Sequence, residues 1–303
     1  MQATDEATPF SSYNKGAEFR GTFDLSPTEL YGKGKVDFER ADLISHKILF
    51  KQKKFFADTA NFHLKAFDEE GFTFSTENVN ATINFQERFG QFISNGAGSY
   101  VRFDKNQYIA YMDRFKWYMD GESIQLGDEK KKLDAGIENA LDLEGPEFIS
   151  VHPKQDSLRF FAPAANYNLR KYIIHCLNVP FINVADARIY PDSGKVTIYK
   201  AAVMDTLKNA GILANTVTKF HNIKNVRANI YGKKSYLANG EYTYYDENNS
   251  PFLIKLAKIS PDTSGQTVSE GFIPDSTNFR FNPYFSFAGK VKLFAANQFL
   301  TFD

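Results

Sequence analysis

The chain has 303 residues, enough for one large or two ordinary domains with a substantial apolar core. Its 36 basic and 36 acidic side chains cancel, so no net field attracts nucleic acid or an anionic membrane surface. It contains 30 Phe and 16 Tyr, and aromatic rings favour the half-buried surface of a β-sheet. We therefore expect an all-β protein without a nucleic-acid partner.

The single cysteine, Cys176, excludes a disulfide within the chain and any multi-thiolate metal site. The first residues have neither a basic start nor an apolar run, so we predict no signal peptide. No stretch approaches the roughly 20 apolar residues of a membrane-spanning helix, so we expect no integral membrane segment. Met1 and the abrupt end at Asp303 suggest a segment excised from a longer parent chain. The rest of that chain would then be its first partner.

Short β-type runs follow one another from Phe19 to residue 126, with a turn about every ten residues. Val36 and Phe38 are two residues apart, so a strand would place them on one face. The run 108–119 fits either a helix or a pair of strands, and its aromatic density favours strands. We predict that residues 1–126 form an N-terminal β-repeat lobe.

Residues 127–146 interrupt this pattern, because they are highly charged and contain no aromatic side chain. Leu133, Ile137 and Leu141 recur at four-residue spacing and would share one helical face. Residues 130–132 are three lysines beside acidic neighbours, which is typical of a solvated surface. We predict a linker with a marginal helix between two lobes.

Strand-like runs resume in residues 147–303, which we predict to form a C-terminal β-repeat lobe. The alternating runs Ala187–Tyr190 and Lys195–Tyr199 flank Pro191-Asp192-Ser193-Gly194. This turn sequence between two alternating runs is the strongest hairpin signal in the chain.

Two passages, 78–100 and 225–244, share the frame Asn-Val-x-Ala-x-Ile, a turn, and then aromatic-aliphatic-small-Asn-Gly. Fainter copies begin at Asn183 and Asn209. In each strong copy Ala and Ile are two apart and would face one side, while Asn-Gly would supply positive φ at a tight turn. Units of this kind bury their apolar faces only by stacking. We expect equivalent layers in an elongated body.

The segments Glu29–Phe38 with Ala41–Leu43, and later 78–85, resemble G-x-G-x-(hydrophobic)-Asp-Phe … Ala-x-(hydrophobic) rungs of large envelope proteins of Bacteroidetes-type bacteria. They are more distantly similar to the OstA and AsmA/TamB classes, whose strands form open β-jellyroll or "taco" structures that carry lipid across the periplasm. The resemblance implies a β-solenoid or open β-jellyroll. It also implies a location in the bacterial cell envelope, in the periplasm or associated with the outer membrane.

The histidines have no metal-ligand spacing, so we predict neither a metal site nor a cofactor; they are His46, His63, His152, His175 and His221. His175 and Cys176 are adjacent and would face opposite sides of a strand, so they cannot form a catalytic dyad. We interpret Cys176 as a buried structural thiol.

Four acids could in principle pair as the catalytic carboxylates of a carbohydrate-active enzyme, within about 5 to 10 Å of each other. They are Asp113, Asp186, Asp192 and Asp205. Asp192 also suits a turn and Asp186 the start of a strand, so we assign no catalytic residue.

Aromatic residues that alternate with polar ones are candidates for a ligand-binding strip that stacks on sugars; they are Tyr108, Trp117, Tyr242 and Tyr244. The competing interpretation, which we favour, is that they form cross-strand aromatic ladders within the sheet.

Our leading hypothesis is a non-enzymatic structural or ligand-bearing segment of a larger bacterial envelope protein, acting as a hydrophobic conduit or scaffold. The alternatives are a carbohydrate-binding or carbohydrate-active protein on a β-scaffold, and an adhesin-like scaffold. A continuous apolar groove would favour a lipid partner. Exposed aromatic rings beside carboxylates would favour a glycan.

Overall fold

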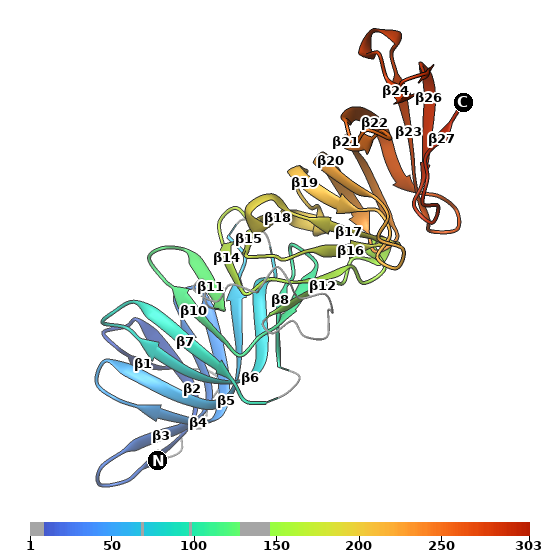
Figure 1. Cartoon of the computed structure of the whole chain (residues 1–303). Coiled ribbons are helices and arrows are strands. Elements are labelled where there is room, and N and C mark those ends of the chain that lie inside the picture. Colours follow the sequence, from blue (N-terminus) through green and yellow to red (C-terminus); the bar gives the residue numbers. More distant parts are fainter. Residues whose placement is uncertain (1–8, 68–69, 97–98, 128–145) are drawn as a thin grey trace.

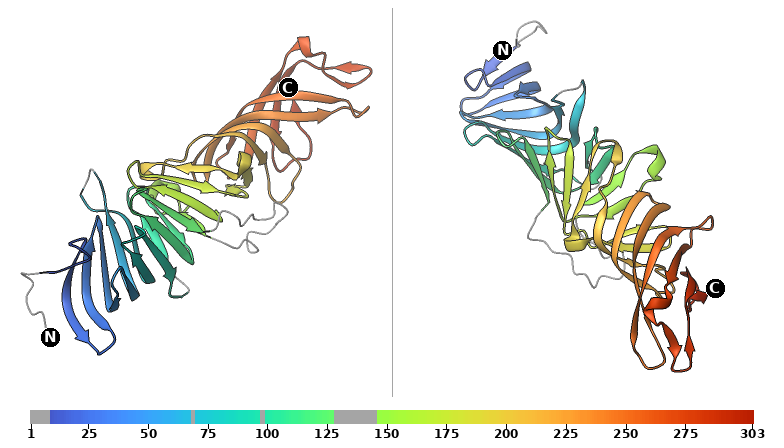
Figure 2. Two further views of the ribbon diagram at one scale, coloured as in Figure 1. Left: turned by 90° about the vertical axis from the view of Figure 1, so that its left-hand side faces the viewer. Right: turned by 90° about the horizontal axis from the view of Figure 1, so that it is seen from above.

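The computed structural model describes residues 9–67, 70–96, 99–127 and 146–303. Within these ranges, 25 strands belong to one antiparallel sheet, which folds and twists along an elongated molecule (Figures 1 and 2). The two ends of the chain lie at opposite ends of this body (Figure 1). The predicted all-β, elongated fold is confirmed.

The N-terminal part is a series of long strands, each paired with the next along the chain. They are β2 (Ala17–Leu25), β3 (Leu30–Phe38), β4 (Ala41–Phe50), β5 (Lys54–Lys65) and β6 (Phe72–Asn84), preceded by the short β1 (Phe10–Ser12). Val36 and Phe38 both face the core, as their spacing predicts.

The sheet divides at β6, because the two halves of this strand pair with different partners. Val79–Asn84 pair with β7, whereas Ser75 and Thr76 pair with β8. Layer A then contains β7 (Phe89–Ser94), β10 (Arg114–Tyr118), β11 (Ser123–Gly127), β14 (Ala164–Asn168), β15 (Ile173–Leu177) and β18 (Val196–Ile198). Layer B contains β8 (Tyr100–Phe103), β9 (Tyr108–Tyr111), β12 (Glu147–Ser150), β13 (Arg159–Phe161), β16 (Ile182–Val184) and β17 (Ala187–Tyr190).

Layer B continues into β19 (Leu207–Leu213), whose second half pairs with β17 and whose two ends both pair with β20. Layer A ends at β18, where Ile198 forms an isolated bridge with Met204. Consecutive antiparallel strands then continue to the C-terminus: β20 (Asn222–Gly232), β21 (Ser235–Tyr245), β22 (Pro251–Pro261), β23 (Thr267–Ile273), β26 (Gly289–Phe294) and β27 (Thr301–Phe302). The strands β24 (Arg280–Asn282) and β25 (Phe285–Ser286) form a separate hairpin. Short 3-10 helices lie in the connections: η2 (Pro153–Gln155), η3 (Asp192–Gly194), η4 (Lys200–Ala202) and η5 (Asp275–Thr277).

The hairpin predicted at 191–194 is wrong. The strand before it, β17, belongs to layer B, and the strand after it, β18, pairs with β15 in layer A. The turn itself is present as η3, with positive φ at Ser193 and Gly194, but it carries the chain across from one layer to the other. Turn residues specify a local reversal of the backbone, and they do not specify which strand the next segment pairs with.

The long strands bend where two consecutive exposed residues interrupt the inward and outward alternation. In β6 these are Glu77 and Asn78, and in β20 they are Lys224 and Asn225. The asparagines have φ of 56° and 51°, a left-handed conformation that asparagine tolerates better than most residues. Asn209 of β19 has the same feature, with φ of 53°. These positions are β-bulges, which bend a strand and re-aim its side chains.

The two strong copies of the repeat therefore occupy equivalent corners of the fold. The Val, Ala and Ile that follow each Asn are all buried. The copy at Asn183 differs, because it lies in the short β16 of one layer.

The positive φ predicted for Asn-Gly is present in one of the two strong copies, and the rest of that turn includes residues 97–98, outside the described ranges. Gly96 has φ of 152° in the loop after β7. Asn239-Gly240, however, lies inside β21, so the prediction of a turn at this position is wrong. A Cβ on Gly240 would lie 2.9 Å from side-chain atoms of Ile223 and Val226, so this glycine permits close packing against the bulge of β20.

The segment predicted as a linker lies almost wholly outside the described residues, which stop at Gly127 and resume at Pro146. The sheet nevertheless continues past this point in both layers. The strands β9 and β11 precede this segment, and they pair with β12 and β14, which follow it. Strands from the two predicted lobes are thus direct neighbours.

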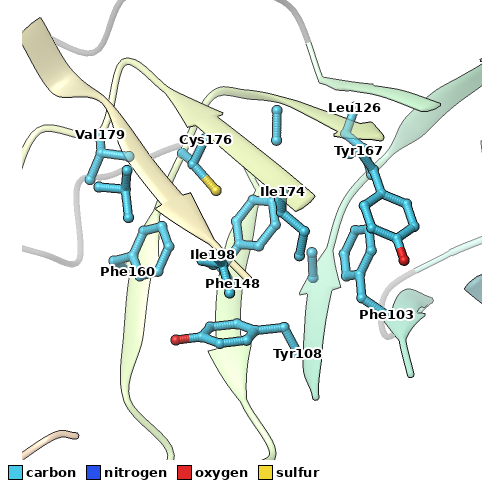
Figure 3. Close-up of a cluster of buried hydrophobic side chains, with 14 of the residues drawn as sticks. Phe103, Tyr108, Leu126, Phe148, Phe160, Tyr167, Ile174, Cys176, Val179 and Ile198 are labelled. Atoms are coloured by element: carbon cyan, nitrogen blue, oxygen red, sulfur yellow. The ribbon is translucent and has the colours of Figure 1, made fainter. Parts of the chain in front are cut away.

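Aromatic side chains fill the space enclosed by the folded sheet. Phe92 packs against Phe62 and stacks on Phe115, with ring centroids 4.3 and 4.4 Å apart. Between the layers, Phe103 lies against Tyr167 with centroids 5.0 Å apart (Figure 3). The hydroxyl of Tyr167 pairs with that of Thr73, so this buried polar group is satisfied.

Replacement of Asn225 tests the bend. Asn225→Gly should retain the left-handed conformation, whereas Asn225→Val should lower the free energy of unfolding by about 1–2 kcal/mol, because a β-branched residue is strained there. Urea denaturation measures this difference. Asn222→Val, on the same strand but without positive φ, is the control and should change stability by less than about 0.5 kcal/mol. An equal loss of stability in Asn225→Val and Asn222→Val would contradict the role of the left-handed conformation at Asn225.

His221 gives a second test, by pH. Burial lowers the pKa of this ring below its usual 6.5, although the hydrogen bond to the carbonyl of Asn297 (2.7 Å) opposes the shift. Because the folded state has the lower pKa, the unfolded chain binds the proton more tightly, and stability should fall as pH drops below about 6.5. Urea denaturation at pH 7.5 and 5.5 should show a larger loss for the wild type than for His221→Gln. An equal loss in both proteins would contradict this assignment.

Candidate functional site

The interior of the folded sheet is occupied by side chains in the described part of the chain. Phe103, Phe148 and Tyr167 are completely buried between the layers (Figure 3). A recess of about 460 Å³ lies instead on the outer surface of the long strands and layer A, with a second of about 500 Å³ beside it. The outer surface is therefore where we place the candidate site.

A row of side chains crosses the outer face from β3 to β18, and each member stands opposite the next in the strand register. We call it the layer A row: Tyr31, Leu49, Phe56, Thr82, Gln91, Lys116, Gln125, Asn166, His175 and Thr197. Directly paired residues point to the same face, and adjacent strands are about 4.8 Å apart. The row thus runs along the body, perpendicular to the strands. Its members are half-buried or exposed.

The two recesses lie over the N-terminal end of this row and join there. The recess of about 460 Å³ includes Phe56, Asp58 and Gln91 in its lining. The recess of about 500 Å³ includes Thr22, Asp24 and His46. Tyr31 and Lys47 belong to both. Together they form one groove over strands β2 to β7, which we call the layer A groove.

Hydrogen bonds hold the aromatic ring of Tyr31 in place. Its hydroxyl donates to Glu29 at 2.6 Å, and Lys51 contacts the other carboxylate oxygen of Glu29 at 3.1 Å. Both contacts lower the pKa of Glu29, and the hydrogen bond to Glu29 raises the pKa of the Tyr31 phenol. Lys47 lies over the same ring, with its Nζ 5.7 Å from the centroid. The ring is thus oriented before any ligand arrives.

Farther along the row, neighbouring side chains orient the polar groups as well. Tyr118 donates to the side-chain oxygen of Gln125 at 3.1 Å. Lys116 lies over the rings of Phe89 and Tyr118, at 4.1 and 5.0 Å from their centroids. The layer A row therefore combines aromatic faces with amide, hydroxyl and ammonium groups. Such a surface can stack on the apolar face of a sugar ring and exchange hydrogen bonds with its hydroxyls.

The structure separates the four aromatic candidates proposed from the sequence. Tyr108 is 0% exposed and Trp117 is 3% exposed, so neither ring lies at a surface where a sugar could stack (Figure 3 shows Tyr108). Tyr242 and Tyr244 are half-buried near the C-terminal end. Tyr244 packs 5.1 Å from Phe279 in an aromatic cluster that fills this end of the core. Phe279 lies outside the strands, so this contact is packing in the core rather than a cross-strand ladder.

Tyr31 and Phe56 were missed in the sequence. For Phe56 a signal existed, because Phe55 and Phe56 are adjacent in a predicted strand and must face opposite sides. Phe55 is buried and Phe56 is half-buried on the outside. Which of the two faces outward depends on the register of β5 against β4 and β6.

Of the acids considered for catalysis, Asp186 has a clear structural role. Its carboxylate accepts hydrogen bonds from the backbone N–H of Thr267 at 3.0 Å and from Asn215 at 3.3 Å, which ties the start of β23 to the loop after β16. Asp192 begins η3, as its turn-forming interpretation predicts. Over the described ranges, no group of three or more His, Cys, Asp or Glu side chains is placed to hold a metal ion.

No protein-family model, curated protein or solved structure matches this chain. Within the part of the chain that the structure describes, no helix has the length and apolar character needed to cross a membrane.

The reactivity of Cys176 tests whether it faces the core while His175, in the layer A row, faces outward. His175 is exposed and Cys176 is 1% exposed, and burial raises the pKa of the thiol. We expect a maleimide reagent to leave Cys176 unmodified in the native protein and to label it completely in denaturant, because thiolate formation and access are both suppressed. Mass spectrometry measures the labelling. In the control His175→Cys with Cys176→Ala, the new thiol should react under native conditions. Labelling of native Cys176 at the same rate as that thiol would contradict the assignment.

Proposed function

We propose that this chain is a non-enzymatic, elongated β-scaffold that binds a linear glycan in the layer A groove and along the layer A row. The observation that carries the proposal is the register itself. Ten side chains on ten strands line up along the body, and the groove opens at one end of this line. An extended polymer matches such a site, because it can repeat the same contacts from one strand to the next.

The composition of the row supports a glycan over a lipid. Tyr31 and Phe56 supply aromatic faces, and Thr82, Gln91 and Asn166 supply hydrogen-bonding groups on the same outer face. A lipid chain would require a continuous apolar path. The apolar residues of the layers are packed against one another instead.

We further propose that the chain acts as a segment of a larger protein of the bacterial cell envelope, in the periplasm or at the outer membrane. The resemblance of residues 29–43 and 78–85 to repeats of such proteins supports this location. In the described part of the chain, β1 and β27 each pair with one neighbouring strand, which is also compatible with a parent chain that continues the strands. In this setting the scaffold would hold glycan strands at a fixed distance from its neighbours.

Affinity electrophoresis of the whole chain in gels that contain soluble xylan, glucomannan, dextran or alginate tests the proposal. We expect at least one of these polysaccharides to retard the wild type. Phe56→Ala should weaken that binding about three- to tenfold, because it removes an aromatic contact worth about 0.5–1.5 kcal/mol. Gln91→Ala should weaken it in the same direction.

Phe272→Ala is the matched control, since Phe272 is an exposed aromatic residue far along the chain, outside the layer A row. It should leave the retardation unchanged. Equal retardation of the wild type and the Phe56 variant would contradict the groove as the site. Lipid that co-purifies in stoichiometric amounts, without retardation by any polysaccharide, would favour the conduit hypothesis instead.

A further inference from the structure

A separate recess of about 420 Å³ lies on the outer face of the other half of the folded sheet, where β5 and β6 adjoin β8 of layer B. Its lining includes His63, Phe72, Glu77, Tyr100, Arg102 and Asp104. This volume is within the range of small-molecule sites. None of these residues belongs to the layer A groove, so the two sites have separate walls.

One wall of this recess is held rigidly by a cross-strand arrangement. Asp42, His63, Ser75 and Arg102 stand opposite one another on β4, β5, β6 and β8. Asp42 contacts Nδ1 of His63 at 2.7 Å, and Lys35 lies 3.6 Å from the same carboxylate. Burial alone would raise the pKa of Asp42, but these two partners outweigh burial and lower it. The carboxylate of Asp42 thus fixes the orientation of the His63 ring.

The aromatic surface of the recess is partly open. The imidazole of His63 stacks on Phe72 with centroids 4.7 Å apart and an interplanar angle of 21°. Phe72 remains 39% exposed and Tyr100 remains 41% exposed. Both rings line the recess and keep part of their surface open to a ligand.

Asp104 and Arg102 supply the polar contacts. Arg102 Nε lies 3.8 Å from Asp104, and the hydroxyl of Ser75 donates to the same carboxylate at 3.5 Å. Both contacts are long, and burial raises the pKa of Asp104. A ligand hydroxyl that donates to this carboxylate would compensate part of its burial cost, and the adjacent guanidinium can donate to a neighbouring hydroxyl.

The series Asp42, His63 and Ser75 contains the residue types of a serine hydrolase triad, but the contacts favour binding. The Ser75 hydroxyl is directed to Asp104, and Arg102 stands opposite Ser75 in the register. A nucleophile would need its hydroxyl hydrogen-bonded to the histidine. His63 contacts Asp42 and Phe72, and so serves as part of the wall.

We propose that this recess binds a single neutral pyranose ring. The carboxylates of Glu77 and Asp104 would repel an anionic ligand, and the Arg102 guanidinium beside Asp104 offsets one of these two charges. A neutral polyol uses both the donor and the acceptor, and its apolar face can lie on Phe72 or Tyr100. The site is independent of the layer A groove, so the scaffold would hold saccharide on both outer surfaces.

Saturation-transfer difference NMR with the methyl pyranosides of glucose, galactose, mannose and N-acetylglucosamine tests this site in the whole chain. We expect at least one glycoside to receive saturation, with an affinity of about millimolar. Asp104→Asn keeps the side-chain shape but loses the charge, and it should weaken binding about tenfold, since hydrogen bonds to charged groups are worth about 1.5–3 kcal/mol. Arg102→Gln should act in the same direction.

Phe272→Ala, which replaces an exposed aromatic residue outside both proposed sites, is the matched control and should leave the glycoside signals unchanged. Urea midpoints close to the wild-type value would show that the variants are folded. Absence of saturation transfer to all four glycosides would overturn the proposal, as would signals that Asp104→Asn and Arg102→Gln leave intact. Loss of the signals in Phe56→Ala alone would assign them to the layer A groove, which separates failure here from failure of the glycan-scaffold proposal.

Discussion

The bend in the long strands is the constraint on which the rest of the structure depends. A single strand contributes to both halves of the folded sheet only if its alternation is interrupted at the corner, so that apolar side chains before and after the bend point into the same core. Asn78, Asn209 and Asn225 provide this interruption through a left-handed conformation. Without it, the residues beyond the corner would turn their apolar face to solvent. The repeated motif therefore places the bend at which the sheet folds onto itself.

Between the two sets of long strands, short strands replace them and the chain crosses repeatedly between layers A and B. Each short strand there belongs to only one layer, so the chain must add strands to the two layers in turn. Aromatic residues such as Phe148 and Tyr167 fill the space that results. Side chains fill the interior, and the strand register aligns polar and aromatic groups on the outer faces, where both proposed sites lie.

The same antiparallel register produces both proposed sites. On one face it places Tyr31, Leu49 and Phe56 side by side, and on the other it places Asp42, His63 and Ser75 side by side. A shift of one residue in β5 would replace Phe56 and His63 with Phe55 and Phe62, or with Ala57 and Leu64. Either shift would remove both surfaces at once. Binding and packing are in this sense encoded by the same pairing. A surface of this kind can change its ligand by exchange of outward residues without change of the core.

The sequence by itself determined the all-β class, the equivalence of residues 78–84 and 225–232, and the opposite orientation of His175 and Cys176, because alternation and left-handed asparagines are local properties of the backbone. It did not determine that 191–194 crosses between layers, that Asn239-Gly240 lies inside a strand, or that Tyr108 and Trp117 are buried. Those outcomes depend on which strands pair, and so do the layer A row and the recess beside His63. Pairing joins residues distant in the chain, and only the tertiary structure decides it.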